Sequence, residues 1–147
     1  MIGRCRRQRY PISPAKLTGS LDDLPQAISR RIRDSIVLQE DEIPAIASVF
    51  SDHDWLFMTT SRIVLRTERG LDTIRNDEVV HVAPDFDACS RDGEYDKSQF
   101  SHLLIKTKSG QQYTVHVEQG AGLLGILSVV FMFVERNFRN SNTDNAK

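Results

Sequence analysis

The sequence predicts a mainly β fold of the α+β class, in which seven antiparallel strands are followed by a C-terminal helix and preceded by an amphipathic helix. Two observations predict this order. Short runs of alternating apolar residues, separated by polar or glycine-containing turns, recur between residues 43 and 118. A longer apolar run begins at Leu123 and has the composition of a buried helix.

Size and composition are those of an ordinary globular domain. The 147 residues are 39% hydrophobic and 27% charged, and a chain of this length buries a real core without disulfides or metal. Cys5 and Cys89 stand in unrelated contexts, with no spacing of a bridge or a metal knuckle. No apolar segment follows the basic first residues, so no secretory signal is visible. We expect one domain with tails, in the reducing cytoplasm.

The N-terminal segment, residues 1–19, is expected to be a basic extended arm. It contains two prolines and little apolar periodicity. Residues 1–33 hold eight basic against two acidic residues, a net +6, which leaves −7 for the rest of a chain whose net charge is −1. Such an arm either contacts an anionic surface or stays solvated. The residues expected to contact anionic lipid head groups are Arg4, Arg6, Arg7 and Arg9.

An amphipathic helix is predicted within residues 20–38, from about Asp23 to Val37. Ser20 and Asp23 have the spacing of a capping box, and Pro25 fits a first turn. The helix needs an apolar surface to dock on, and the domain body is the default. Its apolar residues recur every four positions, at Leu24, Ile28, Ile32 and Ile36.

Seven strands are predicted after this helix, and the hairpin WLFMTTSRIVLRT from Trp55 to Thr67 is the most strand-like part of the chain. Its first strand is expected to be buried and its second half-buried. Residues 87–99 are polar and are expected to form a long mobile loop. The predicted strands are residues 43–50, 55–59, 62–67, 71–75, 79–86, 100–107 and 113–118.

The register of the last hairpin decides where two histidines lie. Placing the apolar residues on one face favours a loop of odd length with Gly110 at positive φ. In that register, Leu104 lies opposite His116 and His102 lies opposite Glu118. Together with His53 and His81, these histidines lack the spacing of a zinc or catalytic motif. Isolated surface histidines are therefore expected.

Two glycine- or acid-rich motifs are interpreted structurally. Residues 120–125, GAGLLG, match GxGxxG, but fewer than two dozen residues follow and no parallel strand can come after the helix, so a tight strand-to-helix corner is predicted. Residues 85–96 are acidic, but their spacing does not fit a calcium-binding loop. No acid, base and nucleophile can be assembled. We therefore expect that the chain is not an enzyme and that it binds no metal or cofactor.

The last helix is predicted from Leu123 to about Asn137, before a polar tail at residues 139–147. About a dozen apolar residues are too few to cross a bilayer, which needs about 20. One stripe of the helix is expected to be buried, with Leu124, Leu127, Phe131, Val134 and Phe138. A second side, with Val129, Met132 and Phe133, needs a cover from the N-terminal helix or a second copy, and these three residues are the candidate partner-binding site.

The hairpin, followed by Asn76-Asp77-Glu78-Val79 at the start of the next strand, resembles the corresponding segment of bacterial pleckstrin-homology-like (PH-like) and GRAM-like domains. The resemblance covers residues 42–138. It implies a bent, nearly closed antiparallel barrel of seven strands that the C-terminal helix caps, and a binding module without catalytic residues. Lipid-binding members place Lys and Arg in the first hairpin loop, where this chain has Ser51-Asp52-His53-Asp54.

These observations predict a non-enzymatic cytoplasmic module that binds protein partners, with self-association as one form. The alternative is a membrane-surface adaptor whose arginine arm binds anionic lipid head groups, through weak and salt-sensitive contacts. Nucleic acid is not an expected partner, because no second cluster of basic and aromatic residues accompanies the arm.

Overall fold

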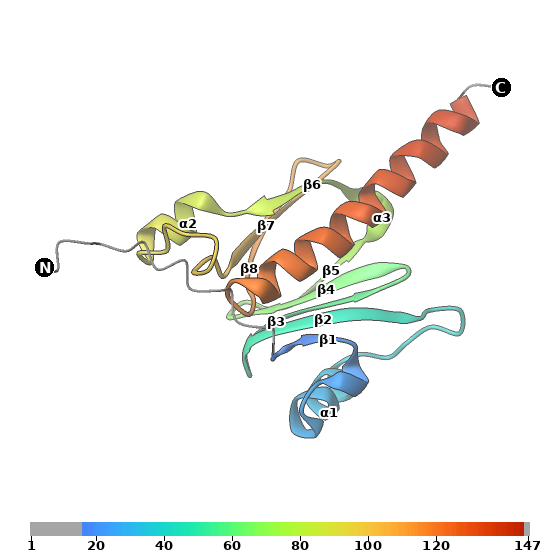
Figure 1. The fold of residues 1–147 in the computed structure, drawn as a ribbon. Helices are drawn as coiled ribbons and strands as arrows, with labels where there is room; N and C mark the ends of the chain where they lie inside the picture. Colours follow the sequence, from blue (N-terminus) through green and yellow to red (C-terminus); the bar gives the residue numbers. More distant parts are fainter. Residues whose placement is uncertain (1–15, 146–147) are drawn as a thin grey trace, which may run out of the picture.

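The computed structural model describes the backbone of residues 16–145 and the side chains of residues 16–136, as two antiparallel sheets with helices packed against them (Figure 1). The first sheet has the order β1 (Thr18–Gly19), β2 (Pro44–Ser51), β3 (Asp54–Thr59), β4 (Arg62–Thr67) and β5 (Gly70–Arg75). The second has the order β6 (Val79–Pro84), β7 (His102–Thr107) and β8 (Gln112–His116). The helices are η1 (Leu21–Asp23), α1 (Gln26–Ser35), η2 (Asn76–Glu78), α2 (Phe86–Arg91) and α3 (Ala121–Asn145).

The predicted α+β class is confirmed, and the predicted strands are present with ends shifted by a few residues. The expected single barrel is not observed within residues 16–145, because the strands pair as two separate sheets. The division falls at η2, a 3₁₀ turn that carries the chain from β5 to β6. Side chains of both sheets nevertheless meet in one core with α3.

The hairpin β3–β4 is buried on both faces. Leu56 and Met58 join the core between the sheets, whereas Trp55, Phe57 and Val64 belong to a second apolar cluster on the other face. The second strand was expected to be half-buried. Val64 is 3% exposed because the N-terminal helices cover that face.

The helix α1 docks on the domain body, as predicted, with Ile32 1% exposed in this second cluster. Its start differs from the prediction. Leu21–Asp23 form the separate turn η1, and Pro25 stands at the N-cap of α1. The Ser20 hydroxyl donates to the Asp23 carboxylate at 3.0 Å and caps no backbone N–H. In Figure 1, α1 lies on the side of the first sheet that faces away from α3.

The helix α3 packs Leu123, Ile126 and Val130 into the core and runs on past the sheets (Figure 1). The expected buried stripe placed Phe131 in the core, but Phe131 is 59% exposed, so the buried side of the helix is rotated from the prediction. The helix begins at the predicted strand-to-helix corner. There Gly120 has φ +67°, and a Cβ would lie 2.8 Å from the Ser98 carbonyl oxygen, which is why glycine stands at this corner.

The segment before α1 is tied to the corner before α3. The Glu118 carboxylate accepts hydrogen bonds from the N–H groups of Lys16 and Leu17, at 2.8 and 3.0 Å, and from the Thr18 hydroxyl at 2.7 Å. Thr18 also pairs with Ser48 of β2. Residues 16–19, the end of the predicted arm, are therefore part of the folded domain.

Candidate functional site

The sequence-predicted site residues are only partly placed. Arg4, Arg6, Arg7 and Arg9 lie outside the described residues. Of the three residues of α3, Met132 is 60% exposed, whereas Val129 and Phe133 are partly buried against the core. Phe131, which was assigned to the buried stripe, is exposed beside Met132. The exposed apolar surface of α3 is therefore centred on residues 131 and 132.

Two of the four histidines come together, where isolated histidines were expected. His102 and His116 are paired residues of β7 and β8, and their rings stack with centroids 3.9 Å apart. Gly110 has φ +86° in the turn, as predicted, but the strands pair two residues out of the expected register, with Leu104 opposite Thr114. The turn closes tightly, because Gly110 N–H donates to the Thr107 carbonyl at 3.0 Å. This correction places His116 opposite His102.

Two carboxylates join this pair. Asp92, Glu94, His102 and His116 each offer one atom that lies within 4.8 Å of the other three. His102 Nε2 is 2.6 Å from Asp92 Oδ2 and 3.8 Å from Glu94 Oε2. Glu94 accepts hydrogen bonds from the N–H and the hydroxyl of Ser101, at 2.7 and 2.6 Å. That hydroxyl has one hydrogen, so His116 Nε2 donates to Ser101 Oγ, at 2.8 Å.

The two carboxylates come from the segment expected to be a loop, which contains α2. The helix ends at Arg91 with Asp92 as its C-cap, and Gly93 follows with φ +76°. The N–H groups of Asp92, Gly93 and Glu94 donate to carbonyls of the last turn of α2, at 2.7 to 3.2 Å. This glycine-ended helix terminus brings both carboxylates to the start of β7. The sequence signal available for it was the glycine within the acidic stretch.

Burial lowers the pKa of His116, and the neighbouring His102 lowers it further, against the opposing effect of nearby carboxylates. The His116 ring is also stacked on Phe50, with centroids 3.8 Å apart. Burial raises the pKa of the Cys89 thiol, whose sulfur lies 3.9 Å from the His102 carbonyl oxygen. His116 is therefore a neutral imidazole at neutral pH, and Cys89 remains a thiol.

A pocket of about 500 Å³ opens beside the histidines, between the two sheets. The turn between β4 and β5 forms one wall, and the stacked histidines form part of the other. Both histidines line this pocket, whereas Asp92 and Glu94 do not. The lining includes Asp54, Arg69, Asp72, His102, Tyr113 and His116.

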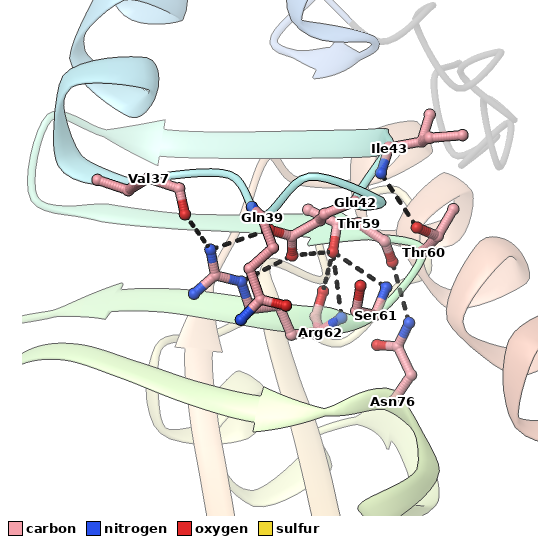
Figure 2. Close-up of polar contacts among 9 residues, drawn as sticks. All are labelled: Val37, Gln39, Glu42, Ile43, Thr59, Thr60, Ser61, Arg62 and Asn76. Atoms are coloured by element: carbon pink, nitrogen blue, oxygen red, sulfur yellow. Dashed lines mark hydrogen bonds and ion pairs between the residues drawn. The ribbon is translucent and has the colours of Figure 1, made fainter.

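A second polar cluster surrounds Glu42, whose side chain is fully buried (Figure 2). Arg62 donates to both of its carboxylate oxygens, at 2.7 and 3.0 Å, and the Thr59 hydroxyl and the Gln39 N–H add bonds of 2.6 and 3.1 Å. The bonds with Arg62 lower the pKa of Glu42 to about 2, against the effect of burial. Arg62 also donates to the Val37 carbonyl at 2.7 Å. The ionised, buried Glu42 therefore connects the segment after α1 to the β3–β4 turn through hydrogen bonds.

Ser101 and His116 have the pairing of a nucleophile and a base, but not the access. Ser101 is 1% exposed, and its hydroxyl hydrogen goes to Glu94. The Ser101 hydroxyl is therefore buried and already bonded to a carboxylate, and is not free to act as a nucleophile in this arrangement. The pair is arranged to position Glu94 and the His116 ring.

A scan against models of known protein families and a search of curated proteins found no match to this chain. Within the helices that the structure describes, none has the length and apolar content to cross a membrane.

Proposed function

We propose that this chain is a non-enzymatic cytoplasmic interaction module of PH-like architecture that pairs with a second copy through the exposed side of α3. The observation that carries the proposal is the exposure of two large apolar neighbours, Phe131 at 59% and Met132 at 60%, on a helix whose other side builds the core. Large apolar side chains that gather on an exposed surface mark sites of association.

The order of elements supports the PH-like part of the proposal. Strands β2–β5 belong to one sheet and β6–β8 to another, and a C-terminal helix packs into the core that the two sheets share. Fold alone does not assign a function, so binding is argued from the exposed side of α3.

The position of α1 supports a second copy as the partner. From the sequence, either the N-terminal helix or another chain was expected to pack on the second apolar side of α3. The N-terminal helix packs on the opposite face of the five-stranded sheet, so within the described residues it does not cover Phe131 and Met132. A two-fold pair would bury the same strip from each copy, with the half-buried Val129 and Phe133 at its border. The net charge of −1 adds little repulsion between copies.

The expected strength follows from the exposed area. Full burial of a Phe or Met side chain contributes about 1.5–3 kcal/mol, so the exposed three-fifths of Phe131 or Met132 contributes about 1 kcal/mol each. A two-fold interface contains each residue twice. Replacing both therefore removes about 4 kcal/mol, which is roughly a thousandfold loss of dimer affinity.

Sedimentation equilibrium of the full chain tests this. We expect a concentration-dependent dimer of the wild type and a monomer for the double variant Phe131→Asp with Met132→Asp. The matched control is Val37→Asp, which changes a side chain that is 88% exposed in the segment between α1 and β2, and should leave the dimer intact. A wild type that stays monomeric at every concentration, or a double variant that dimerises like the wild type, would overturn the proposal.

A further inference from the structure

We infer that Asp92, Glu94, His102 and His116 bind one divalent transition-metal ion, with Zn²⁺ as the preferred ion, where the end of α2 meets β7 and β8. The inference is independent of self-association, because these residues lie on the second sheet and its connection and not on α3. Two imidazoles and two carboxylates are the donor types that zinc takes in proteins.

The distances suit a tetrahedral ion. Zinc binds nitrogen and carboxylate oxygen at about 2.0–2.1 Å, so its ligand atoms lie about 3.3 Å from one another. The candidate atoms span the same scale, from 2.6 Å between His102 Nε2 and Asp92 Oδ2 to at most 4.8 Å for any pair. An ion between them requires movements of about 1 Å at the ends of the side chains.

Charge and donor type favour zinc over magnesium or calcium. Two carboxylates balance the charge of the ion, and the imidazoles contribute neutral nitrogen donors. Magnesium and calcium prefer shells made of oxygen and bind imidazole poorly. Cys89 is buried with its sulfur against the His102 carbonyl oxygen and does not belong to the converging group of donor atoms.

The donors are held in place from behind. Ser101 fixes Glu94 through two hydrogen bonds and His116 through a third. Phe50 fixes the plane of the His116 ring by stacking. Hydrogen-bonded groups behind the ligands commonly orient metal sites and raise their affinity 10- to 100-fold.

An ordinary ion pair does not account for the cluster. That explanation needs only Asp92 and His102, whose bond of 2.6 Å would be complete without further groups. Glu94, with its side chain 16% exposed, and the partly buried His116 bring a second carboxylate and a second imidazole to the same point. Ser101 holds both by hydrogen bonds, and with Asp92 and His102 they make four converging donors, which is more than an ion pair requires. The neighbouring pocket, with both histidines in its wall, gives an ion access to them.

Four protein donors complete a tetrahedral shell and leave no open position for a substrate. The ion would therefore fasten the end of α2 to β7 and β8, rather than catalyse a reaction. Binding would be expected to raise the thermal stability of the domain, because the unfolded chain does not bring the four donors together.

The test is a zinc titration of the full chain after treatment with a chelator, followed by calorimetry and by competition with a chromophoric chelator. We expect one Zn²⁺ per chain, a higher melting temperature, and visible absorption bands of tetrahedral coordination with Co²⁺, with no binding of Mg²⁺. His102→Asn and His116→Asn should each weaken binding at least a hundredfold. The controls His53→Asn and His81→Asn change exposed histidines away from the cluster and should bind as the wild type does.

Asp92→Asn keeps the test decisive if a histidine variant fails to fold, because the Asp92 side chain is 52% exposed and its loss should leave the fold intact. We expect a folded protein by circular dichroism that binds zinc at least tenfold more weakly. Absence of saturable binding by the wild type would overturn the inference. So would binding that Asp92→Asn leaves unchanged, or binding that the control variants abolish.

Discussion

Replacing Glu42 by glutamine isolates the contribution of the buried ion pair. The change keeps the size of the side chain, but the single amide oxygen can accept only one of the two bonds from Thr59 and Gln39, which reach different carboxylate oxygens in the wild type. It removes the charge that Arg62 contacts at 2.7 and 3.0 Å. Because the Glu42 side chain is fully buried, water cannot replace the lost partner. We expect a folded but clearly less stable protein.

The pKa of Glu42 sets the magnitude. A fall from the ordinary 4.5 to about 2 corresponds to about 3 kcal/mol of stability, at about 1.4 kcal/mol for each pH unit. The folded-state pKa is the lower one, so this stability is fully present above pH 4.5 and is lost as the pH falls toward 2. By the same relation, the ionised Glu42 still contributes about 1.4 kcal/mol to the free energy of unfolding at pH 3.

Urea denaturation at pH 7 and pH 3 measures this, with the fluorescence of Trp55 as the probe, since the single tryptophan is 3% exposed in the second apolar cluster. Glu42→Gln should be about 3 kcal/mol less stable than wild type at pH 7, and the difference should shrink by about half at pH 3. Glu40→Gln, at an exposed position two residues earlier, is the control and should change stability by less than about 0.5 kcal/mol. A cost for Glu42→Gln below about 1 kcal/mol at pH 7, or the same cost at both pH values, would refute the reasoning.

Two further predictions concern the packing of the helices, and urea denaturation checks both. Gly120→Ala places a methyl group 2.8 Å from the Ser98 carbonyl oxygen at φ +67° and should cost about 1–3 kcal/mol, whereas Gly125→Ala, whose methyl group would lie 3.8 Å from Thr18, should be neutral or stabilising by about 0.5–1 kcal/mol. Equal effects of the two changes would contradict the account of the corner. Ile32→Ala, at a position 1% exposed between α1 and the first sheet, should cost about 2–4 kcal/mol. A loss no larger than that of an exposed residue would mean that α1 is not docked as described.

The sequence predicted those elements whose periodicity is clear. The alternation in the β3–β4 hairpin and the four-residue spacing around Ile32 each allow one interpretation, and the structure has both elements, with α1 shorter and β4 more buried than predicted. The buried side of α3 could not be predicted in this way, because apolar residues occupy every side of its first turns. Stripes through Leu124 and Phe131 or through Ile126 and Val130 are equally apolar, and contact with the sheets decides between them. Likewise, no local signal shows that β5 and β6 belong to separate sheets.

The polar clusters could not be predicted because they depend on register and on distant partners. A shift of two residues between β7 and β8 decides whether His102 faces His116 or Glu118. Glu42 stood in an acidic segment like any surface carboxylate, and its partner Arg62 lies on another strand. The pattern of residues along one strand does not show which side chain on another strand lies opposite, so these contacts cannot be predicted before the strand register is known.

Disulfide trapping at Met132 tests self-association through α3 most directly. In a two-fold pair centred on Phe131 and Met132, the two copies of residue 132 come close together. With Cys5 changed to Ser, oxidation of Met132→Cys should give a species of twice the chain mass of 16.7 kDa on a non-reducing gel. Val37→Cys in the same background is at least as exposed and should stay at the mass of one chain. Equal trapping of both variants, or no trapping of Met132→Cys, would contradict the proposed interface.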